Sequence, residues 1–212
     1  MAILVPAILE QVKLEFKNKT SLVTKIPNLE RIQVDFGDGI FIANQLLDVA
    51  EMDTLNPAFH WEAHLMVENP KDFLDYKICG FKTIIIHFEA FKSVIDLKQA
   101  IEKIKNLGLR ASVAINPDTP VNTLKDIKAD QYLIMSVVPG KQGQVFLAST
   151  LNKIKDLRQI FPYAIIEVDG GVNETNIKSV KEAGADLICV GSALFKAPNL
   201  NFAYTNLEQA IR

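Results

Sequence analysis

Three side chains that could do chemistry stand in or at the end of apolar segments of the sequence. Asp35 and Asp169 each close an apolar run, where a carboxylate is costly unless it is paired, hydrogen-bonded or bound to a metal. His64 lies inside a third apolar run, Glu62–Met66. Two carboxylates on opposite faces of one carbon can act as acid and base and invert a stereocentre beside a carbonyl. Alternatively, each aspartate only caps the turn that follows it.

The same three residues could hold a divalent metal. Asp35, His64 and Asp169 offer three ligands, and Gln33 could add a weak amide oxygen. A metal ion beside two adjacent oxygens would act as a Lewis acid and stabilise the charge that develops on them. An oxygen-rich set of ligands does not single out zinc as a cluster of histidines or cysteines would.

The remaining two histidines give weaker signals. His87 lies in an apolar strand, where a lone histidine is more often a hydrogen-bonded packing residue than a ligand. His60 stands in an expected loop beside Trp61, without other polar residues of interest, and is interpreted as structural or solvated.

Glycine-rich segments follow three of the expected strands and predict a phosphate site. They are Gly140–Gln144, Gly170–Gly171 and Gly191–Ser192. Backbone N–H groups in such loops, together with a helix N-terminus, form a cradle for an anion. One loop is weak evidence because glycine is common at strand ends, but three converging loops make a phosphate the leading ligand.

The elements that must position these residues alternate along the chain, as in a parallel sheet with crossover helices. Eight strands are expected, at Ile3–Val5, Arg31–Asp35, Glu62–Met66, Thr83–His87, Ala111–Ile115, Tyr132–Val137, Ile165–Asp169 and Leu187–Val190. The clearest helical patterns are Leu97–Asn106, Thr150–Ile160 and Asn176–Ala183. Gly108 and Gly184 mark the ends of two of these helices. No helix is predicted over Asn44–Ala58.

Eight strand–helix units in a chain of 212 residues fit a closed (β/α)₈ TIM barrel, whose functional groups lie on the loops after the strands. The rival fold, an open doubly wound sheet, usually has a glycine-rich turn after its first strand. Here the first strand is followed by Pro6, Ala7, Ile8 and Leu9. No linker-like stretch divides the chain, so a single barrel domain over residues 1–212 is expected.

Composition excludes several classes of protein. Hydrophobic residues make up 49% and charged residues 23%, as in ordinary globular proteins. A formal net charge of −2 argues against a nucleic-acid partner, and the apolar runs are too short to cross a membrane. Cys79 and Cys189 are interpreted as buried free thiols. Without a signal-peptide pattern, a cytoplasmic location is expected.

Motifs spread over nearly the whole chain carry a more specific signal. They are Val34-Asp35 with Asp38-Gly39-Ile40-Phe41 and Asn44, His64-Leu65-Met66-Val67 with Pro70, His87-Phe88-Glu89-Ala90, Asn116-Pro117-Asp118-Thr119-Pro120, Met135-Ser136-Val137-Val138-Pro139-Gly140, Gly143-Gln144, Val168-Asp169-Gly170-Gly171 and Val190-Gly191-Ser192. In this order and combination they resemble the ribulose-phosphate 3-epimerases and their relatives, such as the allulose-phosphate epimerases.

The resemblance implies a metal-dependent epimerase that inverts C3 of a ketose phosphate, converting D-ribulose 5-phosphate to D-xylulose 5-phosphate through an enediolate. It implies that Asp35 and Asp169 are both the acid/base pair and metal ligands, and that His64 is a ligand that also contacts substrate. One divalent ion is implied, either Zn, Fe, Mn or Co. The residues implied to hold the phosphate are Gly140, Lys141, Gln142, Gly143, Gly170, Gly171, Gly191 and Ser192, and Met66 and Met135 would line the mouth. A homo-oligomer is expected by analogy.

The chain departs from the family pattern at positions of this site. Gln33 stands where the family has a metal-binding His, Ala7 where it has Ser, Gly37 where it has Met, and Gln142 where it has Gly. An amide is a far weaker ligand than an imidazole, and Gln142 restricts the loop backbone, although Lys141 adds a cation there. Three hypotheses therefore stay open: a pentose-phosphate epimerase, an epimerase or isomerase of another sugar phosphate, and a non-catalytic phosphosugar-binding barrel without metal.

Overall fold

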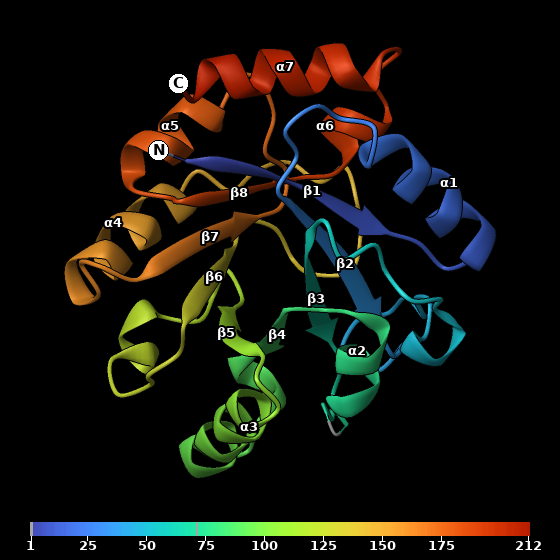
Figure 1. Cartoon of the computed structure of the whole chain (residues 1–212). Helices are drawn as coiled ribbons and strands as arrows, with labels where there is room; N and C mark the ends of the chain where they lie inside the picture. The colour runs from blue at the N-terminus through green and yellow to red at the C-terminus, as the bar shows by residue number, and fades with distance from the viewer. Residues whose placement is uncertain (1, 71) are drawn as a thin grey trace.

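The computed structural model describes residues 2–70 and 72–212 and shows a closed (β/α)₈ TIM barrel (Figure 1). In this range the parallel strands pair in chain order from β1 to β8, and β8 closes the barrel on β1. The strands are β1 (Ile3–Leu9), β2 (Arg31–Gly37), β3 (His60–Met66), β4 (Thr83–His87), β5 (Arg110–Ile115), β6 (Gln131–Met135), β7 (Ile165–Asp169) and β8 (Leu187–Val190).

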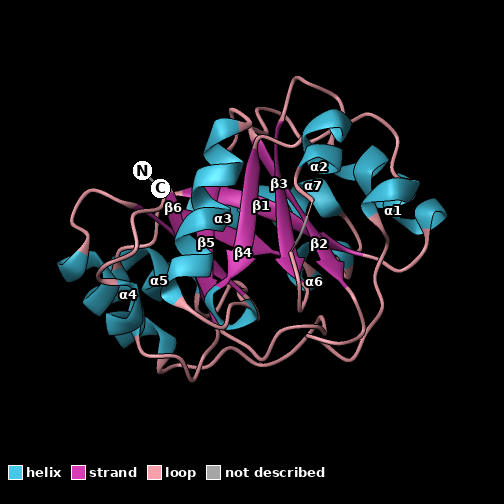
Figure 2. Cartoon of the chain, turned by 90° about the horizontal axis from the view of Figure 1, so that it is seen from below, coloured by secondary structure: helices cyan, strands magenta, loops and turns pink. Residues whose placement is uncertain are grey.

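Helices surround the barrel on the outside, and the two chain ends lie close together (Figures 1 and 2). The helices are α1 (Lys13–Val23), α2 (Leu74–Cys79), α3 (Val94–Asn106), α4 (Thr150–Ile160), α5 (Ile177–Ala183), α6 (Ser192–Phe195) and α7 (Leu200–Ala210). Short 3₁₀ turns at Val49–Glu51 and Val121–Leu124 stand in place of helices after β2 and β5. The first of these is the only helical structure that the described part of Asn44–Ala58 contains, as the sequence predicted.

All eight predicted strands are present, but five of them have different bounds, and the largest differences concern β1 and β6. β1 continues through Pro6 to Leu9, because the strand pairs with β8 up to Pro6 and with β2 from Ala7 onward. β6 ends at Met135 rather than Val137. Ser136 leaves the ladder and donates from its backbone N–H to the carbonyl of Asp169 at 2.7 Å. That hydrogen bond ties the end of β6 to the end of β7.

The predicted helices agree with the structure to within a few residues. α4 has the predicted bounds, and α5 begins one residue later than predicted, at Ile177. α3 begins at Val94 because the Ser93 hydroxyl accepts from the backbone N–H of Asp96 and caps the first turn. Gly184, with φ of 115°, ends α5 in the left-handed conformation that glycine favours.

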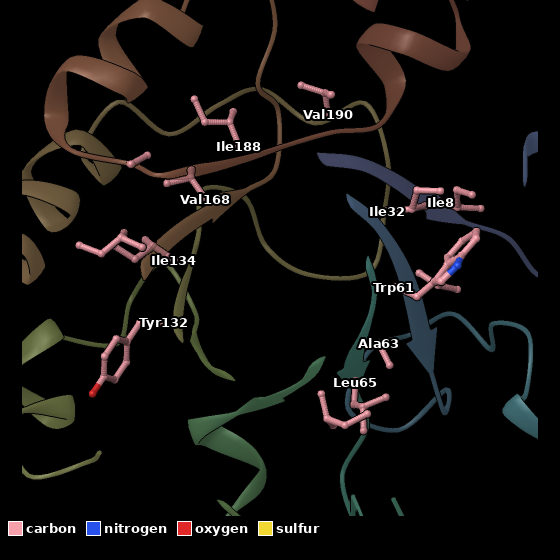
Figure 3. Packing of buried hydrophobic residues seen from close by; sticks show 14 of the residues in the cluster. Ile8, Ile32, Trp61, Ala63, Leu65, Tyr132, Ile134, Val168, Ile188 and Val190 are labelled. Carbon is pink, nitrogen blue, oxygen red and sulfur yellow. The ribbon is translucent and has the colours of Figure 1, made fainter. Parts of the chain in front are cut away.

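Apolar side chains on the outer side of the strands form the main core, which packs against the helices. Ile8, Ile32 and Trp61 belong to this cluster and are fully buried, and Figure 3 shows them together with residues of β6, β7 and β8. Strand residues alternate between the two faces of a sheet. The residues next to these apolar ones therefore project into the barrel, and on β2 and β3 they are polar.

The barrel interior holds a buried polar chain rather than only aliphatic layers. Arg31 donates to Glu62 at 2.7 Å, and the amide of Gln131 donates to Glu62 at 3.3 Å and to Glu167 at 2.5 Å. Cys189 lies 3.1 Å from the other oxygen of Glu167. Burial and the nearby Glu62 carboxylate raise the pKa of Glu167 well above its usual range. This series of buried polar contacts runs through the barrel interior from Arg31, at the amino end of β2, to Cys189 of β8.

The two cysteines differ in how deeply they are buried. Cys79 and Cys189 are both free, and Cys189 is buried as predicted, but Cys79 is only half-buried. Cys79 is the last residue of α2, a short helix without a fully buried residue, so the apolar neighbours in the sequence do not enclose it. Among the described residues, no helix is long and apolar enough to cross a membrane.

His60 was predicted to lie in a loop, and this is wrong. It is the first residue of β3, and its Nε2 lies 2.7 Å from the Thr83 hydroxyl. Burial and the positive charges of Arg31, Arg110 and Lys82 lower the pKa of His60 to about 4. His60 therefore stays neutral inside the folded protein at a pH where it is protonated in the unfolded chain.

This shift predicts a specific loss of stability in mild acid. As the pH falls from about 6.5 to about 4, the unfolded chain takes up a proton on His60 and the folded protein does not, so unfolding becomes easier. His60→Gln, which can still hydrogen-bond Thr83, should lose less stability than wild type between pH 7 and pH 5. Urea midpoints at the two pH values measure this, and equal losses in both proteins would contradict the prediction.

Candidate active site

The three residues singled out from the sequence meet at the carboxyl ends of β2, β3 and β7. His64 Nδ1 lies 3.1 Å from Asp35 Oδ1 and 3.5 Å from Asp169 Oδ2. The His64 side chain is fully buried, and the side chains of Asp35 and Asp169 are 8% and 13% exposed. β2 and β7 are not neighbours in the sheet, so the two carboxylates approach each other across the barrel interior.

Gln33, which is fully buried in the barrel interior, contacts all three of these residues. Its Nε2 donates to Asp35 Oδ1 at 2.8 Å and to Asp169 Oδ2 at 2.9 Å, and it lies 3.4 Å from His64 Nδ1. Its Oε1 accepts from the thiol of Cys189 at 3.2 Å. The amide nitrogen thus stands between the two carboxylates and the imidazole, and the side chain links the site to the polar chain beneath it.

The environment of the site changes the pKa of Asp35 and of His64. Burial, together with repulsion from Asp169, raises the pKa of Asp35 above its usual value. Burial alone would lower the pKa of His64, but hydrogen bonds and charge attraction from Asp169 and Asp35 outweigh it and raise the pKa to about 10. In this arrangement His64 is protonated at neutral pH and balances part of the negative charge.

A second histidine, His87, contacts the first. The Nε2 atoms of His64 and His87 are 2.9 Å apart, and both rings are buried. Burial and the charge on His64 lower the pKa of His87 to about 4, despite the opposing effect of Glu89, so His87 is neutral. One of two Nε2 atoms this close must carry the hydrogen. His64 donates it, and the Nδ1 of His87 then carries its own hydrogen toward Glu89 Oε2, 3.4 Å away.

One cavity opens above the carboxylates, and it includes most of the predicted residues. Asp35, Asp169, Met66 and Met135 line it together with Gly140–Gly143, Gly170–Gly171 and Gly191–Ser192. Gln33 and His64 do not reach its wall, because they are fully buried beneath the two aspartates. Most of the residues predicted to contact substrate therefore line one cavity, whereas His64, which is also predicted to contact substrate, lies buried beneath its wall.

The glycine loops form the other side of this cavity because they pack closely against one another. Gly171 has φ of 64°, and a Cβ there would lie 2.7 Å from the backbone nitrogen of Phe146. Gly140 and Gly143 also have positive φ, of 106° and 76°. The loop after β6 and the loop after β7 thus touch through backbone, and glycines of both loops line the same cavity.

Lys141 and Gln142, the two residues of the loop after β6 that depart from the family pattern, have different surroundings. The backbone of Gln142 is not left-handed. Its side chain packs against Gly191 in the loop after β8, where the Gln142 amide nitrogen would lie 3.5 Å from an added Cβ. Lys141 is exposed at the cavity mouth. Lys196 brings a second cation, because its Nζ would lie 2.9 Å from a Cβ on Gly143.

Sequence reasoning missed three residues around the site. Cys189 lines the cavity and donates to the Gln33 oxygen, whereas the sequence predicts for it only a buried free thiol. Asn44 donates to the carbonyl of Gly140 at 2.6 Å and fixes the first glycine loop. His87 was treated alone. The register of β3 and β4 could have indicated that His87 lies near His64. Ile85 of β4 pairs with His64 of β3, and His87, two residues further along β4, projects to the same face.

Comparison with known proteins adds a family to this geometry. A model of the ribulose-phosphate 3 epimerase family matches residues 3–195. The chain is 36% identical over 192 residues to the chloroplastic ribulose-5-phosphate-3-epimerase of Arabidopsis thaliana, covering 85% of this chain and 67% of that protein. It is 36% identical over 192 residues to ribulose-phosphate 3-epimerase of Synechocystis sp., covering 85% and 82%.

The fold is also similar to more distant solved structures. One is 3-hexulose-6-phosphate synthase from Salmonella typhimurium, with a TM-score of 0.72 at 18% identity over 99% of this chain and 98% of that one. At this identity the similarity concerns the fold alone.

Proposed function

Because the chain belongs to the ribulose-phosphate 3-epimerase family, we propose that it inverts C3 of a pentose phosphate by proton transfer between Asp35 and Asp169. The observation that carries this proposal is the placement of both carboxylates at the floor of one cavity, where each is within 3 Å of the Gln33 amide nitrogen. A sugar carbon held above them would have a carboxylate on either side. D-ribulose 5-phosphate is the proposed substrate and D-xylulose 5-phosphate the product.

The donor set fits a divalent cation. One ligand atom each from Asp35, His64 and Asp169 lies within 4.8 Å of the others, and two carboxylates with an imidazole suit Zn²⁺, Mn²⁺, Fe²⁺ or Co²⁺. The repulsion that raises the pKa of Asp35 would be relieved by such an ion. When bound, the ion would supply positive charge beside the two substrate oxygens that become negative. Gln33 would have to turn its amide oxygen inward to join these ligands.

The chain's own residues account for the remaining steps. One aspartate removes the C3 proton, and the other, on the opposite face, returns a proton to the same carbon. Met66 and Met135 line the wall around the reacting carbon and limit the water that reaches it. The backbone N–H groups of the glycine loops would hold the phosphate, with Lys141 and Ser192 at the same wall.

The test is exchange of the C3 hydrogen. The purified protein is incubated with D-ribulose 5-phosphate in D₂O, and deuterium at C3 and the formation of D-xylulose 5-phosphate are followed by NMR. We expect both, and we expect loss of both after chelation and recovery when a divalent ion is added. Tight binding of the sugar phosphate without any exchange would instead support a non-catalytic phosphosugar-binding barrel.

A second candidate is an epimerase of another sugar phosphate. The observation that favours it is the changed cavity wall, where Ala7, Lys141 and Gln142 contribute side chains that differ from the family pattern. A panel of ketose phosphates of different length, assayed by the same exchange, separates the two. Faster exchange with a hexulose phosphate than with D-ribulose 5-phosphate would favour the second candidate.

His87 is expected to affect this site through His64 without touching substrate. Neutral His87 accepts the Nε2 hydrogen of His64 at 2.9 Å and so leaves Nδ1 directed toward Asp35 and Asp169. Such outer partners typically change metal affinity by about 10- to 100-fold. We expect His87→Leu to weaken binding of Co²⁺ by that amount, and His87→Gln, whose oxygen can accept the same hydrogen, to restore most of it. Calorimetric titration measures both, and equal affinities in the two variants would refute this role.

A further inference from the structure

Gln33 occupies the position in which a cation would sit. Its amide nitrogen is 2.8 and 2.9 Å from oxygens of Asp35 and Asp169 and 3.4 Å from His64 Nδ1. A bound cation would take its ligand atoms from the same three residues. The amide N–H₂ group and the cation therefore cannot occupy the space together, because both need the same oxygen lone pairs and both carry positive charge toward them.

The orientation of the carboxamide is fixed at both of its ends. Both N–H bonds are used, one by each carboxylate. The oxygen accepts from the thiol of Cys189 at 3.2 Å on the other side. If the amide turned over without a cation present, its oxygen would face two carboxylate oxygens and its N–H₂ group would face the sulfur. The site is thus satisfied internally, with amide hydrogens where positive charge is needed.

We propose that Gln33 is an internal competitor of the divalent cation: its amide nitrogen bridges Asp35 and Asp169 in the cation-free protein and must leave before the ion can bind. This inference rests on the proposed function only in taking Asp35, His64 and Asp169 as the ligands. It gives Gln33 the opposite effect from that of a fourth ligand. Removal of a ligand weakens metal binding, whereas removal of a competitor strengthens it.

The sign of that change is measurable without substrate. We expect Gln33→Ala to bind Co²⁺ about tenfold more tightly than wild type or better, since the ion no longer displaces charge-assisted hydrogen bonds. In chelator the same variant should unfold at a lower temperature than wild type, because the carboxylates lose their bridge, and saturating Co²⁺ should remove the difference. Gln33→Leu fills the same space and cannot donate a hydrogen bond. It should show the same gain in Co²⁺ affinity and the same loss of stability in chelator, and it replaces the alanine variant if that variant fails to fold.

Gln131→Ala is the matched control. Gln131 is an equally buried amide in the same barrel interior, but it contacts Glu62 and Glu167 rather than the proposed ligands. Its loss should lower stability and leave Co²⁺ affinity within about twofold of wild type. Weaker or unchanged affinity in Gln33→Ala, no Co²⁺ binding at all, or an equal gain in Gln131→Ala would each overturn the inference. Proton exchange by the wild-type enzyme tests the proposed function separately.

Discussion

Replacing Asp169 with asparagine is expected to slow epimerisation of D-ribulose 5-phosphate by about 10²- to 10⁴-fold, the usual contribution of a positioned acid or base. Asp169 is the last residue of β7 and lines the cavity. An amide can neither take a proton from carbon nor return one, yet it keeps the shape of the side chain and an oxygen for the Gln33 amide. Asp35→Asn should slow epimerisation by a similar factor, because inversion needs a proton donor or acceptor on each face of the carbon.

The two variants should differ in a way that assigns their roles. Exchange of the C3 hydrogen in D₂O is started separately from D-ribulose 5-phosphate and from D-xylulose 5-phosphate. With one base removed, the remaining aspartate can still reach its own face, so each variant should retain exchange with one epimer, and the two variants with opposite epimers. Epimerisation within tenfold of wild type in either variant would refute the two-base mechanism.

Asp38→Asn controls for the loss of a carboxylate near the same end of the barrel. Asp38 accepts backbone hydrogen bonds from Ile40, Phe41 and Glu68 at 2.9, 2.8 and 2.7 Å, and these bonds lower its pKa despite partial burial. It organises the loop after β2 and does not line the cavity. We expect a lower unfolding temperature and a rate within a few-fold of wild type. A loss comparable to that of Asp169→Asn would mean that loop order, not proton transfer, limits the rate.

The sequence predicted the parts of this site that follow from strand direction. Asp35 and Asp169 end apolar runs and His64 lies within one, and parallel strands place such residues on one edge of a barrel. The fold could be predicted for the same reason, because each strand is a distinct apolar run between helical or glycine-rich segments. These are local properties, and each strand carries them independently of how the barrel closes.

Contacts across the barrel could not be predicted in this way. Gln33 on β2 meets Asp169 on β7 only because the sheet closes with a particular stagger of its strands. The pair of His64 and His87 likewise depends on the register of β3 with β4. From sequence alone, Gln33 could only be compared with an imidazole as a ligand. The structure changes that comparison, because the amide uses its nitrogen, not its oxygen, toward the carboxylates.

Gly171→Ala is expected to destabilise the protein by about 2–5 kcal/mol and to disable the loops that we propose hold phosphate. A left-handed backbone costs an L-residue roughly 1–2 kcal/mol, and overpacking of a tight contact typically adds about 1–3 kcal/mol. At Gly171, with φ of 64°, the new Cβ would lie 2.7 Å from the nitrogen of Phe146 and 2.8 Å from the carbonyl oxygen of Gln144. Both are backbone atoms, so one of the two loops must move.

Gly108→Ala separates the two costs. Gly108 also has a positive φ, of 78°, but it follows α3 at the opposite end of the barrel, and a Cβ there has no atom within 4 Å. Gly108→Ala should lose only the free energy of unfolding that comes from the left-handed backbone, about 1–2 kcal/mol. For a chain of this size that is roughly 2–8 °C in melting temperature. Inorganic phosphate should still raise the melting temperature of Gly108→Ala and should no longer raise that of Gly171→Ala. If phosphate stabilises both variants equally, the anion binds elsewhere, since Gly171 packs against backbone of the loop after β6 and Gly108 does not contact these loops.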